Sequence, residues 1–208
     1  MRNCKLFTDF THYVILPNRK IIIVILLLLS YQVYVSAQQF TIGIKITGLS
    51  IHPKGSFNAH LEKYKLDKRG VFVLNPGIAI SFEYFIYKDT LSIKFIQALY
   101  ADCCAQFAGF THLGFRHRIF KYENHQLNGG LGPTFIYRRN WYKLDGYIDD
   151  FVFFKGGPED NWQWRFIWYG GDLEYNYYIN ERTDLSVTII PALPALIDLS
   201  IGARIKGY

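Results

Sequence analysis

Hydrophobic and polar residues alternate along most of the chain, and the stretch 195–208 shows this most clearly. From Ile197 to Lys206, odd-numbered residues are apolar and even-numbered residues are polar, charged or glycine. Successive side chains of a β-strand point to opposite faces, so a period of two predicts a strand with one apolar and one polar face. The same alternation predicts eight strands, at 40–47, 71–87, 91–100, 107–121, 126–138, 162–179, 185–189 and 195–208.

The connections between these strands alternate in length. Short polar turns follow the second, fourth and sixth strands, whereas 48–70 and 139–161 are long polar loops. An even number of strands with short turns at one end and longer loops at the other is typical of an antiparallel up-and-down barrel with both termini at the turn end. In the sixth strand, Gly170-Gly171 shifts the phase of the alternation, which indicates a β-bulge.

Alternation alone does not say which face of the barrel lies inside. A lipocalin-like barrel has an apolar interior and a polar outside, and a membrane barrel has the reverse. Here the polar faces carry large charged residues of both signs, and the apolar faces carry aromatic residues towards the strand ends, as aromatic girdles do. We therefore expect an all-β, eight-stranded antiparallel up-and-down transmembrane β-barrel with a polar, salt-bridged lumen and no wide pore. The residues expected in the lumen network are Lys45, Glu83, His112, Arg116, Arg118, Arg165, Glu174, Asp198 and Arg204.

The first 37 residues have the pattern of a secretory signal peptide. A basic segment precedes an apolar run at 21–29, and Val35-Ser36-Ala37 is a small-residue cleavage site, so 38–208 is the expected barrel domain. The alternative is an uncleaved membrane anchor, but nine apolar residues are far fewer than the roughly 20 that span a bilayer. Of the 23 basic and 17 acidic residues, 4 and 1 lie in this segment, which leaves a net charge of +3 in 38–208. This balance gives no indication of nucleic-acid binding.

Over 38–208, the chain resembles the small eight-stranded outer-membrane β-barrel proteins of Gram-negative bacteria. Its end is similar to their C-terminal assembly signal, because Ser200, Gly202 and Ile205 fit the spacing of that signal, although Gly207 stands at the final aromatic position and Tyr208 follows one residue later. The resemblance implies an outer-membrane location after export. It implies as partners the outer-membrane lipid, lipopolysaccharide and, during insertion, the outer-membrane assembly machinery. It leaves any extracellular partner open.

Three classes of function remain open from the sequence. The first is a barrel that acts in envelope structure or surface interaction through its long outer loops. The second is a membrane-embedded lipid A-modifying enzyme, and the third is a lipocalin-like carrier of a small apolar ligand. The long loops favour the first class, because exposed aromatic side chains are common anchors of recognition. The candidate binding residues are Trp141, Tyr142, Tyr147, Phe151, Phe153 and Phe154, for which the alternative interpretation is an upper aromatic girdle.

Signals of catalysis are weak. His112 with Glu83 or Glu174 has the residue types of a general acid–base pair, but a lumen salt-bridge network is the simpler interpretation. Outer-membrane lipid A deacylases carry a His-x-Ser pair. No histidine of the predicted barrel is followed two residues later by Ser or Thr. Cys103-Cys104 lacks the spacing of a zinc site, so we expect neither a metal nor a cofactor. The sequence leaves the enzyme question open and leans towards a non-enzymatic role.

Overall fold

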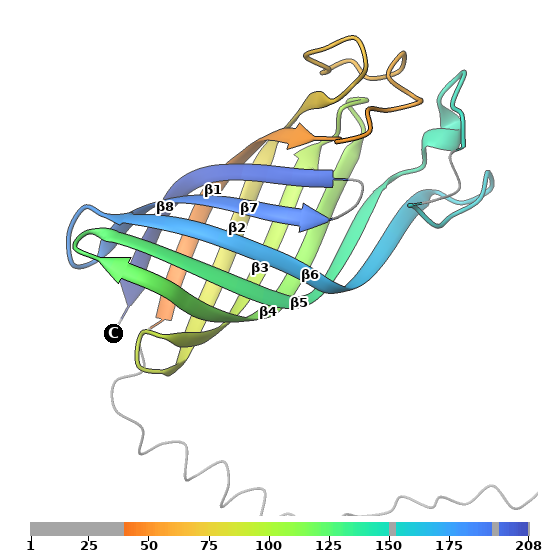
Figure 1. Ribbon diagram of the computed structural model, residues 1–208. Helices are drawn as coiled ribbons and strands as arrows, with labels where there is room; N and C mark the ends of the chain where they lie inside the picture. The colour runs from red at the N-terminus through yellow and green to blue at the C-terminus, as the bar shows by residue number, and fades with distance from the viewer. Residues whose placement is uncertain (1–39, 150–152, 193–195, 208) are drawn as a thin grey trace, which may run out of the picture. The chain divides into compact units, whose positions relative to one another are not determined.

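The computed structural model describes residues 40–149, 153–192 and 196–207, and shows a closed antiparallel barrel in which each strand pairs with its neighbours in sequence and β1 pairs with β8 (Figure 1). The predicted up-and-down fold is therefore confirmed. The strands are β1 (Phe40–Ile51), β2 (Phe72–Tyr87), β3 (Leu91–Ala101), β4 (Phe107–Tyr122), β5 (His125–Arg139), β6 (Trp162–Tyr178), β7 (Thr183–Ala192) and β8 (Leu196–Gly207), with one 3-10 turn, η2 (Trp141–Lys143). No helix within the described ranges is long and apolar enough to cross a membrane.

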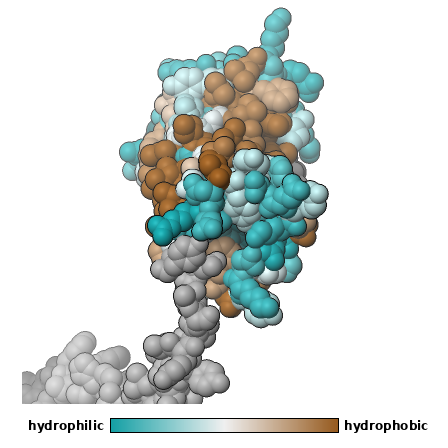
Figure 2. All heavy atoms as spheres, turned by 90° about the vertical axis from the view of Figure 1, so that its left-hand side faces the viewer, coloured by the Kyte–Doolittle hydropathy of each residue, from teal (hydrophilic) through white to brown (hydrophobic). Residues whose placement is uncertain are grey.

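The alternation of the sequence becomes the two faces of the barrel wall. Polar residues such as Lys94 and Arg116 point into the barrel and are buried, whereas Ile44, Phe115 and Leu131 lie on the outer wall with 60–67% of their surface exposed. Figure 2 shows a broad patch of hydrophobic side chains on the wall, with hydrophilic side chains above and below it. This polarity is the reverse of that of a lipocalin-like barrel.

Two strands, β6 and β1, contain an irregularity in their pairing. The predicted bulge in β6 is present, and it lies just before the glycine pair, where Trp168 and Tyr169 together stand opposite Pro133. The prediction that the first strand ends at residue 47 is wrong. Gly48 is an extra residue relative to β8, so the phase of β1 shifts there and the strand continues to Ile51.

The interior has two different halves. Towards the turns it is charged, but towards the long loops it is filled by apolar side chains, so the expectation of a polar lumen holds for only part of the barrel. The apolar cluster consists of Ala79, Ile96, Ala98, Tyr100, Ala108, Phe110, Ile136, Ile167 and Ile190. Phe153 and Phe154, which precede β6, pack against it.

The wall is incompletely paired at one seam. The ladder between β6 and β7 has six residue pairs, from Leu173↔Ile189 to Tyr178↔Asp184, whereas each of the other seven ladders has ten or more. Above this point β7 pairs only with β8, and Figure 1 shows β6 and β7 separating towards the loop end. Position 191 is a proline, which has no backbone N–H with which to donate to a ladder.

Candidate functional site

The charged half of the interior is organised around Glu174 on β6. This carboxylate is fully buried and accepts hydrogen bonds from Lys94 Nζ and Arg116 Nη2, each at 2.6 Å. Lys45 and Arg204 are also paired with it. Four cations from β1, β3, β4 and β8 therefore meet at one carboxylate.

Three more buried carboxylates balance these cations. Glu83 lies 3.1 Å from Arg116 and 3.2 Å from Arg204, Asp172 lies 3.2 Å from Lys94, and Asp184 lies 3.9 Å from Arg204. We call this group the lumen network: Lys45, Glu83, Lys94, Arg116, Asp172, Glu174, Asp184 and Arg204. Buried charges are tolerated when each one is paired, and each charged group of the network has an opposite charge within 4.0 Å.

The catalytic candidates lie in or beside this network. His112 is fully buried, its Nδ1 lies 2.7 Å from Thr134 Oγ1, and its Nε2 lies 3.8 Å from Asp172. Glu83 also accepts a hydrogen bond from Ser92 at 2.6 Å. A general acid or base must reach the proton that it transfers. Side chains this enclosed favour a structural role for His112, Glu83 and Glu174.

Three of the expected network residues lie elsewhere. Arg118 pairs with Asp89 at the β2–β3 turn, because its position on β4 is close to the end of the barrel. Arg165 faces the cavity at the loop end, and Asp198 binds Ser50 near the same end. Conversely, Lys94 belongs to the lumen network but was not among the residues predicted for it. The alternation of Lys94 with Ile93 and Phe95 does indicate that it lies on the polar face of β3.

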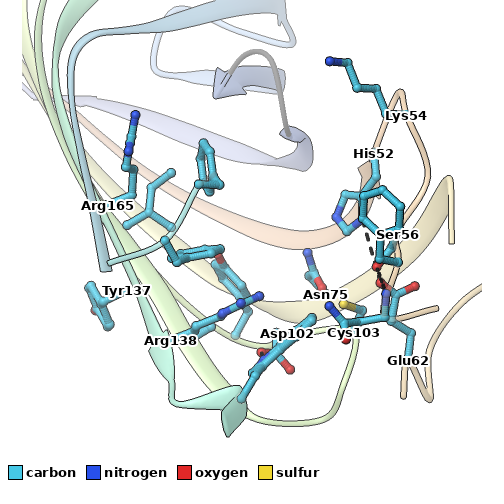
Figure 3. A pocket seen from close by; sticks show the side chains of 18 of the residues that line it. His52, Lys54, Ser56, Glu62, Asn75, Asp102, Cys103, Tyr137, Arg138 and Arg165 are labelled. Atoms are coloured by element: carbon cyan, nitrogen blue, oxygen red, sulfur yellow. Dashed lines mark hydrogen bonds and ion pairs between the residues drawn. The ribbon is translucent and has the colours of Figure 1, made fainter. Parts of the chain in front are cut away.

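A cavity of about 550 Å³ lies at the loop end of the barrel, and we call it the mouth pocket. Its floor is the loop-side surface of the apolar cluster, with Ile136 and Ile167 among its lining residues. Figure 3 shows Arg138 and Arg165 on one side of the pocket and His52 and Glu62 on the other. The volume lies in the range of small-molecule sites, which are mostly apolar with a few polar groups.

Loop aromatics that were predicted to be exposed turn inward and help to build this pocket. Trp141 is only 4% exposed, and its Nε1 donates a hydrogen bond to Asp102 at 2.7 Å. Its ring lies 3.6 Å from the Arg138 guanidinium, which lies 3.9 Å from the Phe154 ring on another side. Trp141 is thus no exposed anchor, because it fixes the loop to the β3–β4 turn. Of the remaining candidates, Tyr147, Phe153 and Phe154 line the pocket, Tyr142 is partly buried beside Asp149, and Phe151 lies outside the described residues.

Two titratable side chains meet on the other side of the pocket. His52 Nδ1 lies 4.0 Å from a carboxylate oxygen of Glu62, which is 3% exposed. Burial lowers the pKa of His52 to about 4. Burial also raises the pKa of Glu62, against the lowering effect of the Ser56 and Cys103 side chains. The folded loop therefore favours the neutral forms of both groups.

Replacing Glu62 by glutamine should stabilise the protein at pH 8. A carboxyl group whose pKa is raised by folding binds protons more tightly in the folded state, so its contribution to stability is present below its ordinary pKa of 4.5 and is lost as the pH rises through the folded value. The neutral variant lacks this loss, so its advantage in urea midpoint over the wild type should shrink from pH 8 to pH 4. Glu159→Gln, at an exposed position in the other long loop, is the control and should change the midpoint little. An equal midpoint for Glu62→Gln and wild type at pH 8 would contradict the prediction.

Comparisons with known proteins return similarities of fold. No protein-family model matches the sequence, and no curated protein matches it. Among solved structures, the chain is similar to Ail, the attachment invasion locus protein of Yersinia pestis, in complex with a heparin analogue (14% identity, TM-score 0.46, 83% of this chain and 100% of that chain). It is also similar to the N-terminal β-barrel domain of Pseudomonas aeruginosa OprF (12%, 0.46, 82% and 99%) and to Neisserial surface protein A (9%, 0.41, 81% and 95%). At these identities the likeness concerns the architecture alone.

Proposed function

We propose that the protein is a sealed outer-membrane barrel that acts in envelope structure or surface interaction through its loop end. The observation that supports this best is the polarity of the wall, which is apolar outside and charged within. Soluble monomers rarely expose contiguous apolar patches larger than a few hundred Å². Apart from the upper part of the β6–β7 seam, the barrel satisfies its backbone groups within its own sheet, as a structure that spans a membrane must.

Polar groups on the outer wall support a low-polarity environment there. Gln97 on β3 accepts a hydrogen bond from Thr111 Oγ1 at 2.7 Å, and it donates one to the Tyr137 hydroxyl at 2.9 Å. A hydroxyl or amide loses much of its solvation in lipid, so mutual pairing is what such a wall requires. Near the loop end, Trp162 packs against Phe107 and Tyr137, which is consistent with an interfacial aromatic girdle.

The lumen network supports a role other than that of a pore. Its ion pairs connect opposite sides of the barrel, as Lys45 on β1 and Lys94 on β3 both reach Glu174 on β6. The work of the protein is then left to the loop end and the mouth pocket. The proposed partners are outer-membrane lipid and lipopolysaccharide, and the assembly machinery during insertion.

Cell fractionation with gel mobility tests this proposal. The protein should stay with the outer-membrane fraction after a urea wash and should migrate differently before and after boiling. Black-lipid recordings should show no stable open channel. Recovery from the soluble periplasm without a mobility shift would overturn the membrane assignment. An altered acyl pattern of lipid A in a deletion strain would instead support the enzymatic alternative.

A further inference from the structure

The mouth pocket continues to the incompletely paired seam of the wall. Arg165, Ile167 and Tyr169 all line the pocket, and all three lie in the part of β6 that has no partner in β7. Ile167 faces the interior and is buried, whereas Tyr169, in the β6 bulge, is 72% exposed. The pocket lining therefore passes from the apolar interior to the outer surface of the barrel at this seam.

Among the described residues, a backbone bridge covers the upper end of the free edge of β6. Lys155 exchanges two backbone hydrogen bonds with Trp164, of 2.8 and 2.9 Å. Below this bridge, no strand ladder to β7 is present among the described residues until Leu173 pairs with Ile189. Residues 165–172 of β6 are therefore without a ladder to β7, and Arg165 is the first of them.

The pocket holds two guanidinium groups that no carboxylate neutralises within 4.0 Å among the described residues. Arg138 uses its Nε to donate to Gln163 at 2.9 Å, and its plane is held between two aromatic rings, so its direction is fixed. Arg165 has a buried Nε without a hydrogen-bond acceptor among the described residues, and its guanidinium carbon lies 5.6 Å from the centre of the Phe153 ring. Unsatisfied buried donors carry a cost that an anionic ligand would remove.

The acidic groups of the pocket offset this charge only at longer range, because Asp102 acts on Arg138 without forming an ion pair with it. Asp102 already accepts hydrogen bonds from the backbone N–H groups of Cys104 and Gln106 and from the Trp141 indole. Glu62 lies across the pocket, beside His52 (Figure 3). The wall that carries Arg138 and Arg165 is therefore cationic above an apolar floor.

We propose that the mouth pocket binds a single-chain anionic amphiphile, with its carboxylate or phosphate on Arg138 and Arg165 and its hydrocarbon chain leaving through the β6–β7 seam. The apolar floor and the seam next to the outer wall suit a hydrocarbon chain. The two guanidinium groups, which have no carboxylate partner, suit an anionic head group. This assignment rests on the proposed membrane location, since the seam opens onto lipid only in a barrel that spans the bilayer. It also gives the loop end a specific task.

Binding of dodecanoate to the purified barrel in amphipol tests the anionic head. Arg165→Gln should weaken dodecanoate binding at least about tenfold by calorimetry, because a charge-assisted hydrogen bond is lost. It should leave the weaker binding of dodecan-1-ol unchanged. Arg139→Gln is the matched control, because Arg139 is an exposed neighbour whose guanidinium lies over Trp162 outside the pocket. Equal binding of acid and alcohol by the wild type, or full binding of the acid by Arg165→Gln, would overturn the proposal.

A dodecanoate with a diazirine at its methyl end tests the path of the chain. In phosphatidylcholine nanodiscs, illumination should label peptides containing Ile167–Tyr169 or Ile189–Ile190. The label should appear both when the probe is added to the water and when it is preloaded in the bilayer. Labelling confined to residues 52–62, or only from the water, would overturn the seam as the path of the chain. Heat-modifiable mobility of the same samples reports membrane insertion separately, so a failure of binding is distinguishable from a failure of the barrel assignment.

Discussion

Glu174→Gln should be among the most damaging single substitutions in the barrel, and we expect it to lower the free energy of unfolding by about 3–5 kcal/mol or more, the usual cost of breaking a buried ion pair. The substitution keeps the size of the side chain but removes the negative charge. Lys45, Lys94, Arg116 and Arg204 would then surround a neutral amide. Four buried cations would be left with three carboxylates, and an unpaired buried charge is costly.

The measurement is the urea midpoint of the refolded protein, followed by the fraction that keeps its unboiled gel mobility. Asp89→Asn is the control, because Asp89 also pairs with an arginine, Arg118, but is 43% exposed at a turn. Exposed ion pairs typically contribute less than about 1 kcal/mol, so this control should shift the midpoint only slightly. Similar shifts of the urea midpoint for both variants would show that burial does not determine how much an ion pair contributes to stability.

Leu113→Arg should block insertion or cost about 2–4 kcal/mol, the penalty for a cation on the lipid face near the middle of the bilayer. Leu113 is on the outer wall in the middle part of β4, and it stands opposite Phe95 of the neighbouring strand β3. The neighbouring polar side chains on this wall, Gln97 and Thr111, already hydrogen-bond to each other and carry no negative charge to pair with the arginine. Assembly is measured as the fraction of protein in the outer membrane with heat-modifiable mobility.

Ile148→Arg is the matched control for this substitution. Ile148 is exposed to a similar degree, 54% against 49% for Leu113, but it lies in the loop between β5 and β6. The same new charge there should leave assembly unchanged. Normal assembly of Leu113→Arg would mean that the outer wall at this height faces water.

Regular alternation was sufficient to predict the eight strands, because most of the outward-facing residues are apolar and most of the alternate residues are polar or small. The bulge in β6 was also predictable, since Gly170-Gly171 marks the change of phase. β3 shows where this reasoning stops. Its inward side changes from Ser92 and Lys94 to Ile96 and Ala98, and the polar residue of the second half, Gln97, lies on the outer wall, so no polar phase marks the interior there.

The mouth pocket was beyond the reach of local patterns. Its cationic side comes from Arg138 and Arg165, and its opposite side comes from His52 and Glu62. Its floor comes from four strands, through Tyr100, Ala108, Ile136 and Ile167. Only closure of the barrel brings these residues together. Arg165 had been assigned to the charged lumen because its phase is inward, but phase does not reveal height along the barrel, and at its height the interior is apolar.

The convergence on Glu174 also has a consequence for the order of assembly. Lys45 and Arg204 come from the first and last strands, which meet each other only when the sheet closes. In an open, partly inserted sheet, Glu174 and its cations need water or other partners, so the lumen of such an intermediate must stay hydrated. Expulsion of that water and pairing of the terminal strands then become a single event, which makes the last step of folding cooperative and its reversal slow.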